Sequence, residues 1–569
     1  MRIRRIAIQN FRGIEECEWW LDTPLACLVG PGDSTKTTIL DAVGLALSRN
    51  YTVQFVDSDF HRCDASKPIV VQVLVSGFPP DLNTNQHFSF YRSFLGSKNI
   101  LQSEPIGDVI PGLDIRLTVD DSLEPQWVVI RPDGQSKYIS AADRRLLGFF
   151  RLGEHVDMHL RWSRTSALTT LSEKSPETKS ILVSAARAAR EAVFNHHNEE
   201  LNRTTDDVAK LSKLMGSNHG STLRAGLDPT GVATSHALVL HDGEIPLTTS
   251  GLGSRRLAAL SIQEGAVEKG AIIGIDEIEH GLEPHRLSHV LRHLKESKNY
   301  TNGQILFTTH SPITIINLSI EDIYVVRSAN GKTRVQRVVA SLKDGQGFIR
   351  SSPDGLLSRR IIVGEGATEV GFLRHLLVHI DQTLQEYPSP TSITAGVAII
   401  DGGGANSISR ASSFNELGYP TLLLMDNDDR NIDSKIEVAR STGVGITQWS
   451  SGNCLESELV LHSSLEILSE MLKIISGTID ESRMIRSLRD KSKLDSIKGL
   501  DVSSWIVNPE DEAVVRRALT DCLKGNAWGI KSQTGGELLA EAFVNHLPHF
   551  EQTAMRGPIS QIREFTYGL

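Results

Sequence analysis

The sequence has 569 residues, more than one hydrophobic core usually organises, so several domains are expected. Hydrophobic residues make up 40% and charged residues 22%, and no window holds a membrane-length apolar run, which favours a cytoplasmic protein without a membrane anchor or signal peptide. The net charge of −10 argues against a uniformly basic nucleic-acid-binding surface, although it permits a local basic groove. Five scattered cysteines without a C-x-x-C pair indicate neither a disulfide framework nor a zinc site.

An apolar run at 25–29, a small-residue turn and a helical pattern after it predict a strand, a phosphate-binding loop and a helix. Backbone N–H groups and the helix N-terminus would cradle phosphates, Lys36 would reach the terminal ones, and the Thr37 hydroxyl would hold Mg²⁺. The loop residues expected to bind the nucleotide are Gly30, Gly32, Ser34, Lys36, Thr37 and Thr38. Thr35 stands where the G-x-x-x-x-G-K-[ST] motif has glycine, and Asp33 adds a negative charge. Both departures could weaken ATP binding or hydrolysis, and a turn that binds nothing is the alternative.

Residues 3–8 and 15–19 are expected to pair as a β-hairpin, and strands at 68–77 and 113–130 to form an antiparallel subsheet that flanks the nucleotide. The sequence N-F-R-G-I at 10–14 separates the hairpin strands, and the phosphate loop follows soon after. This order resembles the head of the SMC/RecF branch of ABC-type ATPases.

Arginines are frequent just before residue 165: Arg144, Arg145, Arg151, Arg161 and Arg164. They could face DNA, but a solvated helix face is the favoured interpretation because charge runs usually are solvated. At 166–224 the apolar spacing becomes helical. We expect an antiparallel helical pair there, inserted into the head as a dimerisation element.

The second part of the head, expected at 225–345, carries further motifs. Residues 249–257 look like the degenerate signature of this ATPase branch, whose serine and glycines touch the terminal phosphate bound by the other protomer; the matching residues are Ser250, Gly251 and Gly253. A buried strand then ends in two acids, of which Asp276 would join the Mg²⁺ shell and Glu277 would position or deprotonate the attacking water. The next strand ends in Thr-His-Ser-Pro, which would let His310 hydrogen-bond the terminal phosphate.

A polar stretch at 341–358 is expected to link the head to a second domain. The following strand ends in Glu365, and Glu369 comes one helical turn later, so both carboxylates should face one pocket. A further buried strand ends in Asp426 and Asp428, which period two places on one side. Such acids could hold two divalent ions that clamp the attacking and leaving oxygens of a phosphodiester displacement. A calcium loop or an acidic turn would explain one of the two clusters but not both.

E-G-x-x-E followed by a strand and D-x-D resembles the TOPRIM fold. A RecF-like ATPase followed by a TOPRIM domain resembles the OLD (overcoming lysogenization defect) family, including the Gabija nuclease subunit and retron-associated nucleases. The resemblance implies an α/β chain with a RecF/SMC-like ABC ATPase head at 1–165 and 225–345 and the helical dimerisation insertion at 166–224. The TOPRIM nuclease domain is expected at 355–569, with its own helical insertion at about 461–520.

The resemblance also implies the remaining site residues. Glu456, with Glu458 second, would join the metal site, and Lys531 would stabilise charge beside the scissile phosphate, with Lys524 as its competitor. The implied catalytic residues are Glu277, Glu365 and Lys531. The implied metal ligands are Thr37 and Asp276 for the Mg²⁺ that accompanies ATP, and Glu365, Glu369, Asp426, Asp428, Glu456 and Glu458 for Mg²⁺ or Mn²⁺ at a two-metal nuclease site.

The expected function is an ATP-binding, metal-dependent DNA endonuclease or nickase in bacterial antiphage defence. Its expected partners are DNA, further copies of the chain in a homodimer or higher even oligomer, and a defence-system protein or retron DNA, with no membrane. Whether ATP activates or restrains cleavage stays open. The rival is an SMC/RecF-like DNA repair ATPase with a non-cutting TOPRIM domain; a topoisomerase would need a tyrosine nucleophile in a recognisable DNA-binding domain, which the sequence lacks.

Overall fold

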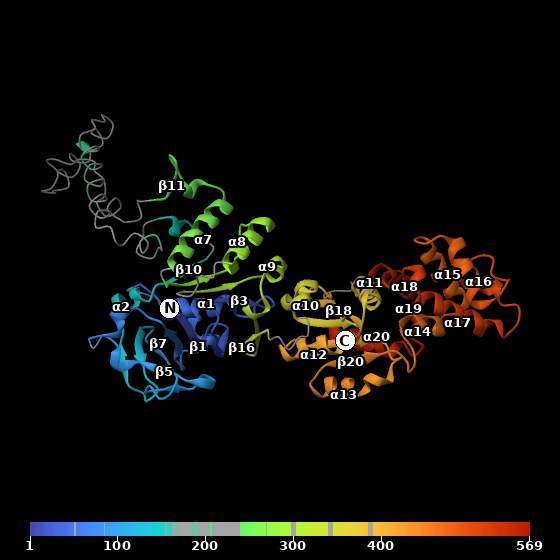
Figure 1. The fold of residues 1–569 in the computed structure, drawn as a ribbon, viewed down its shortest axis with the longest axis horizontal. Helices are drawn as coiled ribbons and strands as arrows, with labels where there is room; N and C mark the ends of the chain where they lie inside the picture. The colour runs from blue at the N-terminus through green and yellow to red at the C-terminus, as the bar shows by residue number, and fades with distance from the viewer. Residues whose placement is uncertain are drawn as a thin grey trace. The chain divides into compact units, whose positions relative to one another are not determined.

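The computed structural model describes residues 1–50, 53–84, 86–153, 156–161, 239–268, 270–296, 303–338, 345–384 and 391–568, with single positions between 162 and 238. The helical pair expected at 166–224 falls outside the described residues apart from those single positions. The chain forms two compact units (Figure 1). The first comprises Met1–Leu28, Thr35–Asn317 and Ser328–Val335, and the second Val29–Ser34, Leu318–Arg327 and Gln336–Leu569. The domain boundaries expected from the sequence stay predictions.

The N-terminal part of the head is antiparallel, as expected. Strand β1 pairs with β2 as a hairpin and with β4 on its other side, and β4 continues to β7 and β8. Buried and exposed side chains alternate along much of β2, as in a strand with one face on the core. The strands of this part are β1 (Arg2–Phe11), β2 (Ile14–Trp20), β4 (Ile69–Ser76), β5 (Ser93–Leu95), β6 (Leu101–Gln102), β7 (Ile110–Val119), β8 (Pro125–Ile130) and β9 (Ser136–Tyr138).

The second part of the same sheet is parallel and carries the nucleotide motifs. Its order is β10-β13-β14-β3, followed by β15 and β16, which lead to β2. Because β10, β13, β14 and β3 run parallel, their carboxyl ends share one edge. The bounds are β3 (Leu25–Val29), β10 (Phe149–Leu152), β13 (Ile272–Ile275), β14 (Gln304–Thr308), β15 (Ile323–Ala329) and β16 (Lys332–Arg337); a small hairpin joins β11 (His241–Asp242) to β12 (Ile245–Pro246).

Helix α1 follows β3 through the phosphate loop and packs against strands of both parts of the sheet, including β4, β7, β13 and β14. The helices α7, α8 and α9 gather on the other side of the parallel strands (Figure 1). This layering buries α1 in the middle of the head and fixes the direction of its N-terminus. The helices are α1 (Lys36–Ala46), α2 (Ala141–Leu146), α7 (Leu252–Glu268), α8 (Pro284–Glu296) and α9 (Pro312–Asn317).

The second unit is built on a parallel sheet in the order β18-β17-β19-β20. Helix α11 packs closely on α18 because glycines stand at the contact: a Cβ on Gly371 would lie 1.9 Å from the carbonyl oxygen of Gln533, and one on Gly536 would lie 2.0 Å from that of Thr368. The strands are β17 (Arg360–Gly364), β18 (Val397–Asp401), β19 (Thr421–Met425) and β20 (Gly445–Gln448). The helices are α10 (Gly345–Ser351), α11 (Ala367–Thr383), α12 (Ser407–Glu416), α13 (Asp433–Ser441), α14 (Leu455–His462), α15 (Leu465–Ser476), α16 (Glu481–Ser492), α17 (Asp511–Lys524), α18 (Gln533–Asn545), α19 (Leu547–Phe550) and α20 (Arg556–Tyr567).

The prediction of a polar linker at 341–358 is wrong for residues 345–357, which form regular structure. From residue 345 the chain forms α10 and then a 3₁₀ turn at Pro353–Leu357. Phe348 and Leu356 are buried, and the Phe348 ring stands edge-on to Phe414 with centroids 4.9 Å apart. A few apolar anchors therefore turn a polar stretch into packed structure. Residues 461–520 are largely helical, as expected, with α15, α16 and most of α17 in that range.

All five cysteines are free thiols. Among the helices of the described residues, none combines the length and the apolar character needed to cross a bilayer.

Candidate functional site

Gly30 and Thr35, in the phosphate loop, both have positive φ angles. Gly30 has φ of 148°, and a Cβ there would lie 2.4 Å from the carbonyl oxygen of Val326. Thr35 takes the left-handed conformation expected of glycine, with φ of 69°, and its hydroxyl contacts that of Thr333 at 3.0 Å. The Asp33 side chain is 97% exposed, so it projects into solvent rather than into the fold.

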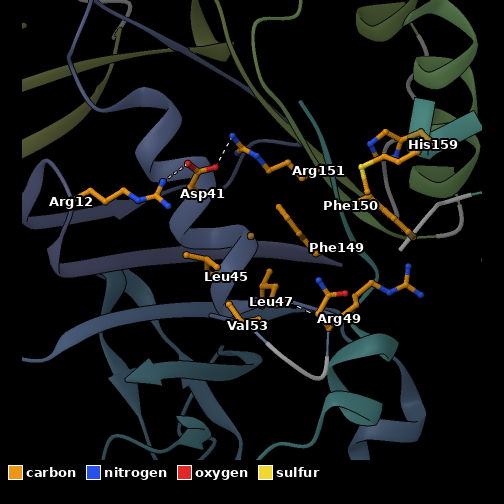
Figure 2. Close-up of a pocket in the computed structure, with 14 residues that line it drawn as sticks. Arg12, Asp41, Leu45, Leu47, Arg49, Val53, Phe149, Phe150, Arg151 and His159 are labelled. Carbon is orange, nitrogen blue, oxygen red and sulfur yellow. Dashed lines mark hydrogen bonds and ion pairs between the residues drawn. The ribbon is translucent and has the colours of Figure 1, made fainter. Parts of the chain in front are cut away.

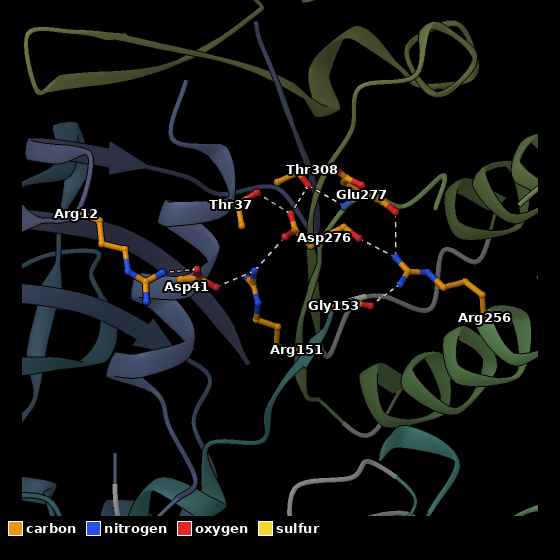
Figure 3. A network of polar contacts seen from close by, with 9 residues as sticks. All are labelled: Arg12, Thr37, Asp41, Arg151, Gly153, Arg256, Asp276, Glu277 and Thr308. Atoms are coloured by element: carbon orange, nitrogen blue, oxygen red, sulfur yellow. Dashed lines mark hydrogen bonds and ion pairs between the residues drawn. The ribbon is translucent and has the colours of Figure 1, made fainter. Parts of the chain in front are cut away.

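The carboxylate of Asp276, which follows β13, is the centre of the polar network in Figure 3. Its Oδ1 accepts hydrogen bonds from the Thr37 hydroxyl at 3.0 Å and the Thr308 hydroxyl at 2.6 Å. Thr308 Oγ1 in turn accepts from the backbone N–H of Glu277 at 2.8 Å. The first residues after β13 and the last residue of β14 thus meet the start of α1, and Thr37 and Asp276 stand together as Mg²⁺ ligands would.

Arg151, on β10, extends this network. Its Nη2 lies 3.2 Å from Asp276 Oδ2 and 2.8 Å from Asp41 Oδ1, and Asp41 Oδ2 also accepts from Arg12 Nη1 at 2.8 Å (Figure 3). Arg12 Nε further pairs with Asp59 Oδ1 at 2.9 Å. A chain of alternating charge therefore runs from Arg12 to the acid after β13.

The solvated arginine face expected before residue 165 is wrong for Arg151 and Arg144. Arg144 is buried, donates to the carbonyl oxygens of Ser48 and Asn50, and stacks on Trp127. Arg145 is exposed, as expected. Arg164 falls outside the described residues.

Arg256, in the signature helix α7, was not expected to have a role. Its side chain is fully buried, and its guanidinium donates to the carbonyl oxygens of Gly153 at 2.6 Å, Asp276 at 2.7 Å and Glu277 at 2.9 Å (Figure 3). Glu277 itself has φ of 45°, a strained conformation for a residue other than glycine. Arg256 therefore holds the backbone that presents both acids. Its place within the signature segment 249–257 was the one sequence signal that could have found it.

The segment after β14 is held by Glu279. Its Oε1 accepts from the His310 backbone N–H at 2.6 Å, and its Oε2 from the Thr309 hydroxyl at 2.7 Å. Burial lowers the pKa of His310, and the nearby positive charge of Lys36 lowers it further. The proximity of these two side chains places the fourth motif beside the start of α1.

The signature residues stand at the start of α7. Gly251 is exposed, Ser250 and Gly253 are partly exposed, and a Cβ on Gly253 would lie 3.0 Å from the carbonyl oxygen of Gly281. A second protomer could reach these residues from solvent. Their contact with its nucleotide stays a prediction.

A pocket of about 400 Å³ opens beside the charge chain, and no phosphate-loop residue lines it (Figure 2). It follows the C-terminal half of α1 and is lined by basic and aromatic side chains, among them Arg12, Arg49, Arg151, Phe149 and Phe150. His159 also lines it, and burial lowers the pKa of this imidazole to about 4. The pocket therefore lies beside the C-terminal half of α1 and not at the phosphate loop.

In the second unit, the carboxyl ends of β17 and β19 bring the predicted acids together. Glu365 Oε2 accepts from the backbone N–H of Asp426 at 2.8 Å, and Asp426 Oδ1 accepts from that of Leu455 at 3.1 Å. Glu369 turns back so that its Oε2 accepts from the Gly366 N–H at 2.8 Å. Two neighbouring parallel strands and the start of α14 thus converge on one point.

The electrostatics of these acids call for a cation. Burial raises the pKa of Asp426 to about 8, and the charges of Glu369, Glu365 and Glu456 contribute. Burial likewise raises the pKa of Glu369 to about 7, and Glu456 adds to the rise. Carboxylates this close cannot all stay ionised without positive charge between them. Their oxygen donors suit Mg²⁺ or Mn²⁺, so the residues present fit the metals expected from the sequence.

Glu456 fits this site better than Glu458. Both are buried, but the oxygens of Glu458 accept from Ser450 Oγ at 2.7 Å and Asn453 Nδ2 at 2.6 Å, which ties that carboxylate to the preceding loop. The charge of Glu456 instead acts directly on Asp426. This geometry favours Glu456 as the ligand.

Lys524, rather than Lys531, reaches the acids. Its Nζ lies 3.7 Å from Asp428 Oδ2. Burial by itself would lower the pKa of the Lys524 ammonium. Contact with Cys454 and the negative charges of Asp428 and Glu456 outweigh this effect and raise the pKa. Lys531 is exposed and, among the described residues, forms no ion pair with these carboxylates. The geometry favours Lys524 where the sequence favoured Lys531, and the identity of the catalytic lysine stays a prediction.

Two family models match the chain. An AAA domain described as "putative AbiEii toxin, Type IV TA system" matches residues 25–317, and the "Overcoming lysogenization defect protein-like, TOPRIM domain" matches residues 356–428. A curated relative, "OLD nuclease" of Thermus scotoductus, is 23% identical over 473 residues, which cover 76% of this chain and 84% of the relative. Among solved structures, the SMC head domain from Thermotoga maritima has a TM-score of 0.29 at 13% identity, covering 60% of this chain and all of that one. An Smc head from Pyrococcus furiosus has a TM-score of 0.34 at 12% identity, covering 58% of this chain and 95% of that one.

Proposed function

The chain belongs to the OLD family of nucleases, with an AAA-type ATPase domain followed by an OLD-like TOPRIM domain, and on that premise we propose that it is a divalent-metal-dependent DNA endonuclease or nickase. The nucleotide state of the ATPase head regulates the cut. The protein acts in the bacterial cytoplasm as part of antiphage defence.

One observation carries the proposal: the carboxylates of Glu365, Glu369, Asp426 and Glu456 gather at the carboxyl ends of two parallel strands, where burial and neighbouring negative charges raise the pKa of Glu369 and Asp426. A fold that only scaffolds would gain nothing from such mutual repulsion, which costs stability unless a cation compensates it. With Asp428, this set supplies oxygen ligands for two divalent ions.

These residues divide the work of phosphodiester hydrolysis. Glu365, Glu369, Asp426, Asp428 and Glu456 would hold Mg²⁺ or Mn²⁺, which when bound activates water and stabilises the developing charge on the phosphate. The chain itself fixes the carboxylates, since backbone N–H groups orient Glu365, Glu369 and Asp426. Lys524 adds a positive charge beside Asp428 for the transition state.

In the head, Lys36 and the loop N–H groups would hold the phosphates of ATP, while Thr37 and Asp276 complete the shell of its Mg²⁺. Glu277 is proposed to position the attacking water, and His310 to contact the terminal phosphate. DNA is the substrate, and the functional form is a homodimer or higher even oligomer joined through the head. A defence-system protein or retron DNA would supply the activating signal.

The test is cleavage of supercoiled and linear plasmid in Mg²⁺ or Mn²⁺, with and without ATP. Glu365→Gln should abolish cutting, whereas Glu437→Gln on the exposed face of α13 should leave it unchanged. If Lys36→Ala keeps or increases cutting, the head restrains the nuclease; if it abolishes cutting, nucleotide licenses it. ATP hydrolysis without metal-dependent cutting under any of these conditions would overturn the proposal in favour of a repair ATPase.

The catalytic lysine is tested in the same assay. Lys524→Ala should reduce the cleavage rate by at least about 100-fold, as expected for the loss of a charge that acts on the transition state. Lys531→Ala should have a much smaller effect because its side chain is exposed. The reverse order would return the role to Lys531.

A further inference from the structure

Within the described residues, one group of three side chains presents metal-ligating atoms to a common point, and one of the three is a thiol. A carboxylate oxygen of Asp426, one of Asp428 and the Sγ of Cys454 all lie within 4.8 Å of one another. No sequence pattern singles out Cys454, because it has no paired cysteine nearby. The fold brings it to the acids.

The approach of Cys454 is enforced by the backbone. The loop before α14 is tied to the end of β19 by the hydrogen bond from Asn427 N to Asn453 O at 2.9 Å and by that from Leu455 N to Asp426 Oδ1 at 3.1 Å. These two contacts flank Cys454 on both sides. Its side chain is only 3% exposed, whereas Asp428 opens to solvent, so an ion can enter from the Asp428 side.

Two of these donors, Cys454 and Asp428, contact side chains that a bound cation would displace. The Cys454 Sγ lies 3.3 Å from Ser457 Oγ, and the Asp428 carboxylate lies 3.7 Å from the Lys524 ammonium. Lys524 therefore supplies positive charge at the same point where the three donors meet. A divalent cation would take over this role at shorter distance.

The chemistry of the three donor atoms determines which cation they bind most tightly. Donors that share one tetrahedral ion at zinc-like bond lengths stand about 3.6 Å apart, so small side-chain rotations bring the present spacing to binding distance. Carboxylate oxygens alone suit Mg²⁺ and Mn²⁺, but a thiolate selects softer ions such as Zn²⁺ and Cd²⁺. The set of Asp426, Asp428 and Cys454 is therefore softer than an all-carboxylate site.

We propose that Asp426, Asp428 and Cys454 bind Zn²⁺ more tightly than Mg²⁺, and that Zn²⁺ bound there occupies one position of the nuclease site and inhibits it. The metal–sulfur bond replaces the S–H bond, the proton passes to water, and no group is oxidised or reduced. The inhibition rests on the proposed nuclease function, whereas the binding does not.

Binding is measured without DNA. Co²⁺ and Cd²⁺ are titrated into the metal-free full chain while thiolate-to-metal charge-transfer absorption is recorded. The native chain should develop this absorption at one ion per chain, and Cys454→Ser should abolish it. Serine is a favourable residue at the start of a helix, so this variant should keep α14 and its thermal stability. Cys63→Ser, which removes the exposed thiol, is the matched control and should keep the absorption.

Competition gives the affinity for zinc. Zn²⁺ should displace Co²⁺ at equimolar concentration while a large excess of Mg²⁺ should not, and Cys454→Ser should weaken Zn²⁺ binding at least about tenfold. Absence of charge-transfer absorption in the native chain, or its persistence in Cys454→Ser, would overturn the proposal.

Inhibition is measured in the plasmid assay at fixed Mg²⁺. Zn²⁺ should inhibit the native chain at lower concentration than Cys454→Ser. If no preparation cuts DNA but the thiol-dependent absorption is present, the nuclease function fails while the zinc site stands. If cutting occurs and Zn²⁺ inhibits both chains equally, the inhibitory role of Cys454 is overturned.

Discussion

Residues that end strands could be found from the sequence, and residues that contact them across the fold could not. Asp276, Glu365 and Asp426 each follow an apolar run, so their place at a sheet edge follows from a local pattern and the parallel pairing of the strands. Arg151 reaches Asp276 from 125 positions away, and no local pattern announces that contact. For the same reason Arg256 emerged only from the folded chain, as did the geometric reason to favour Lys524 over Lys531.

The unusual threonine of the phosphate loop leads to a first prediction. Thr35→Gly relieves a left-handed conformation that costs about 1 kcal/mol and gives up a hydrogen bond to Thr333 worth about as much. Its unfolding free energy should therefore stay close to that of the native chain. Thr35→Ala loses the bond and keeps the strain, so it should be less stable than Thr35→Gly by about 1 kcal/mol. Denaturant unfolding of both variants measures the order, and an equal or more stable alanine variant would contradict it.

His159 leads to a prediction for pH. Burial lowers the pKa of this imidazole from 6.5 to about 4. Between these two pH values the unfolded chain binds a proton at His159 and the folded chain does not. The free energy of unfolding should fall as pH drops from about 6.5 towards 4, by on the order of 3 kcal/mol from this group. His159→Gln can keep the contact with Gln263 but cannot be charged. Calorimetry at pH 7 and pH 5 should show a smaller drop in melting temperature for the variant, and parallel drops would exclude this role of His159.

At the scale of elements, periodicity located the strands of both sheets, because alternation and buried apolar runs are local properties. It failed at 341–358, where polar composition hid the anchors Phe348 and Leu356 that fold residues 345–357. Composition describes the average of a segment, whereas packing depends on the few side chains that find a partner. The close contact of α11 with α18 was hidden for the same reason.

That contact leads to a prediction for a residue without a functional group. A Cβ on Gly536 would lie 2.0 Å from the Thr368 carbonyl oxygen, a backbone atom that moves only if the helices separate. Gly536→Ala should destabilise the chain by at least about 2 kcal/mol. It should also weaken stabilisation by Mn²⁺, because Thr368 precedes Glu369. Gly557→Ala in α20 is the control, since its Cβ meets nothing within 4 Å. The melting temperatures of both variants, measured with and without Mn²⁺, test this prediction. If Gly536→Ala and Gly557→Ala lower the melting temperature equally, the packing argument is refuted.

At the scale of the whole molecule, the order of motifs along the chain was enough to indicate an ATPase head followed by a TOPRIM domain, and the family models agree. The motifs could not tell whether nucleotide binding in the head acts on the TOPRIM domain. Each motif reports the chemistry of one edge of one sheet, whereas coupling depends on surfaces that have no short sequence pattern. The extent of each domain and the role of 166–224 stay predictions for this reason.

The signature at the start of α7 leads to the last prediction, which concerns assembly. Ser250 and Gly251 are accessible to solvent, and in the resembled ATPases these positions contact the nucleotide of a second protomer. With ATP and Mg²⁺, Glu277→Gln should retain bound nucleotide by slowing hydrolysis and should shift the molar mass towards an even oligomer in sedimentation experiments. Adding Ser250→Arg should reverse that shift, because the larger cation would obstruct the shared phosphate contact. Ser261→Arg, on the exposed side of the same helix, should not reverse it. An assembly that forms equally without nucleotide, or that tolerates Ser250→Arg, would mean that the heads do not join through their ATP.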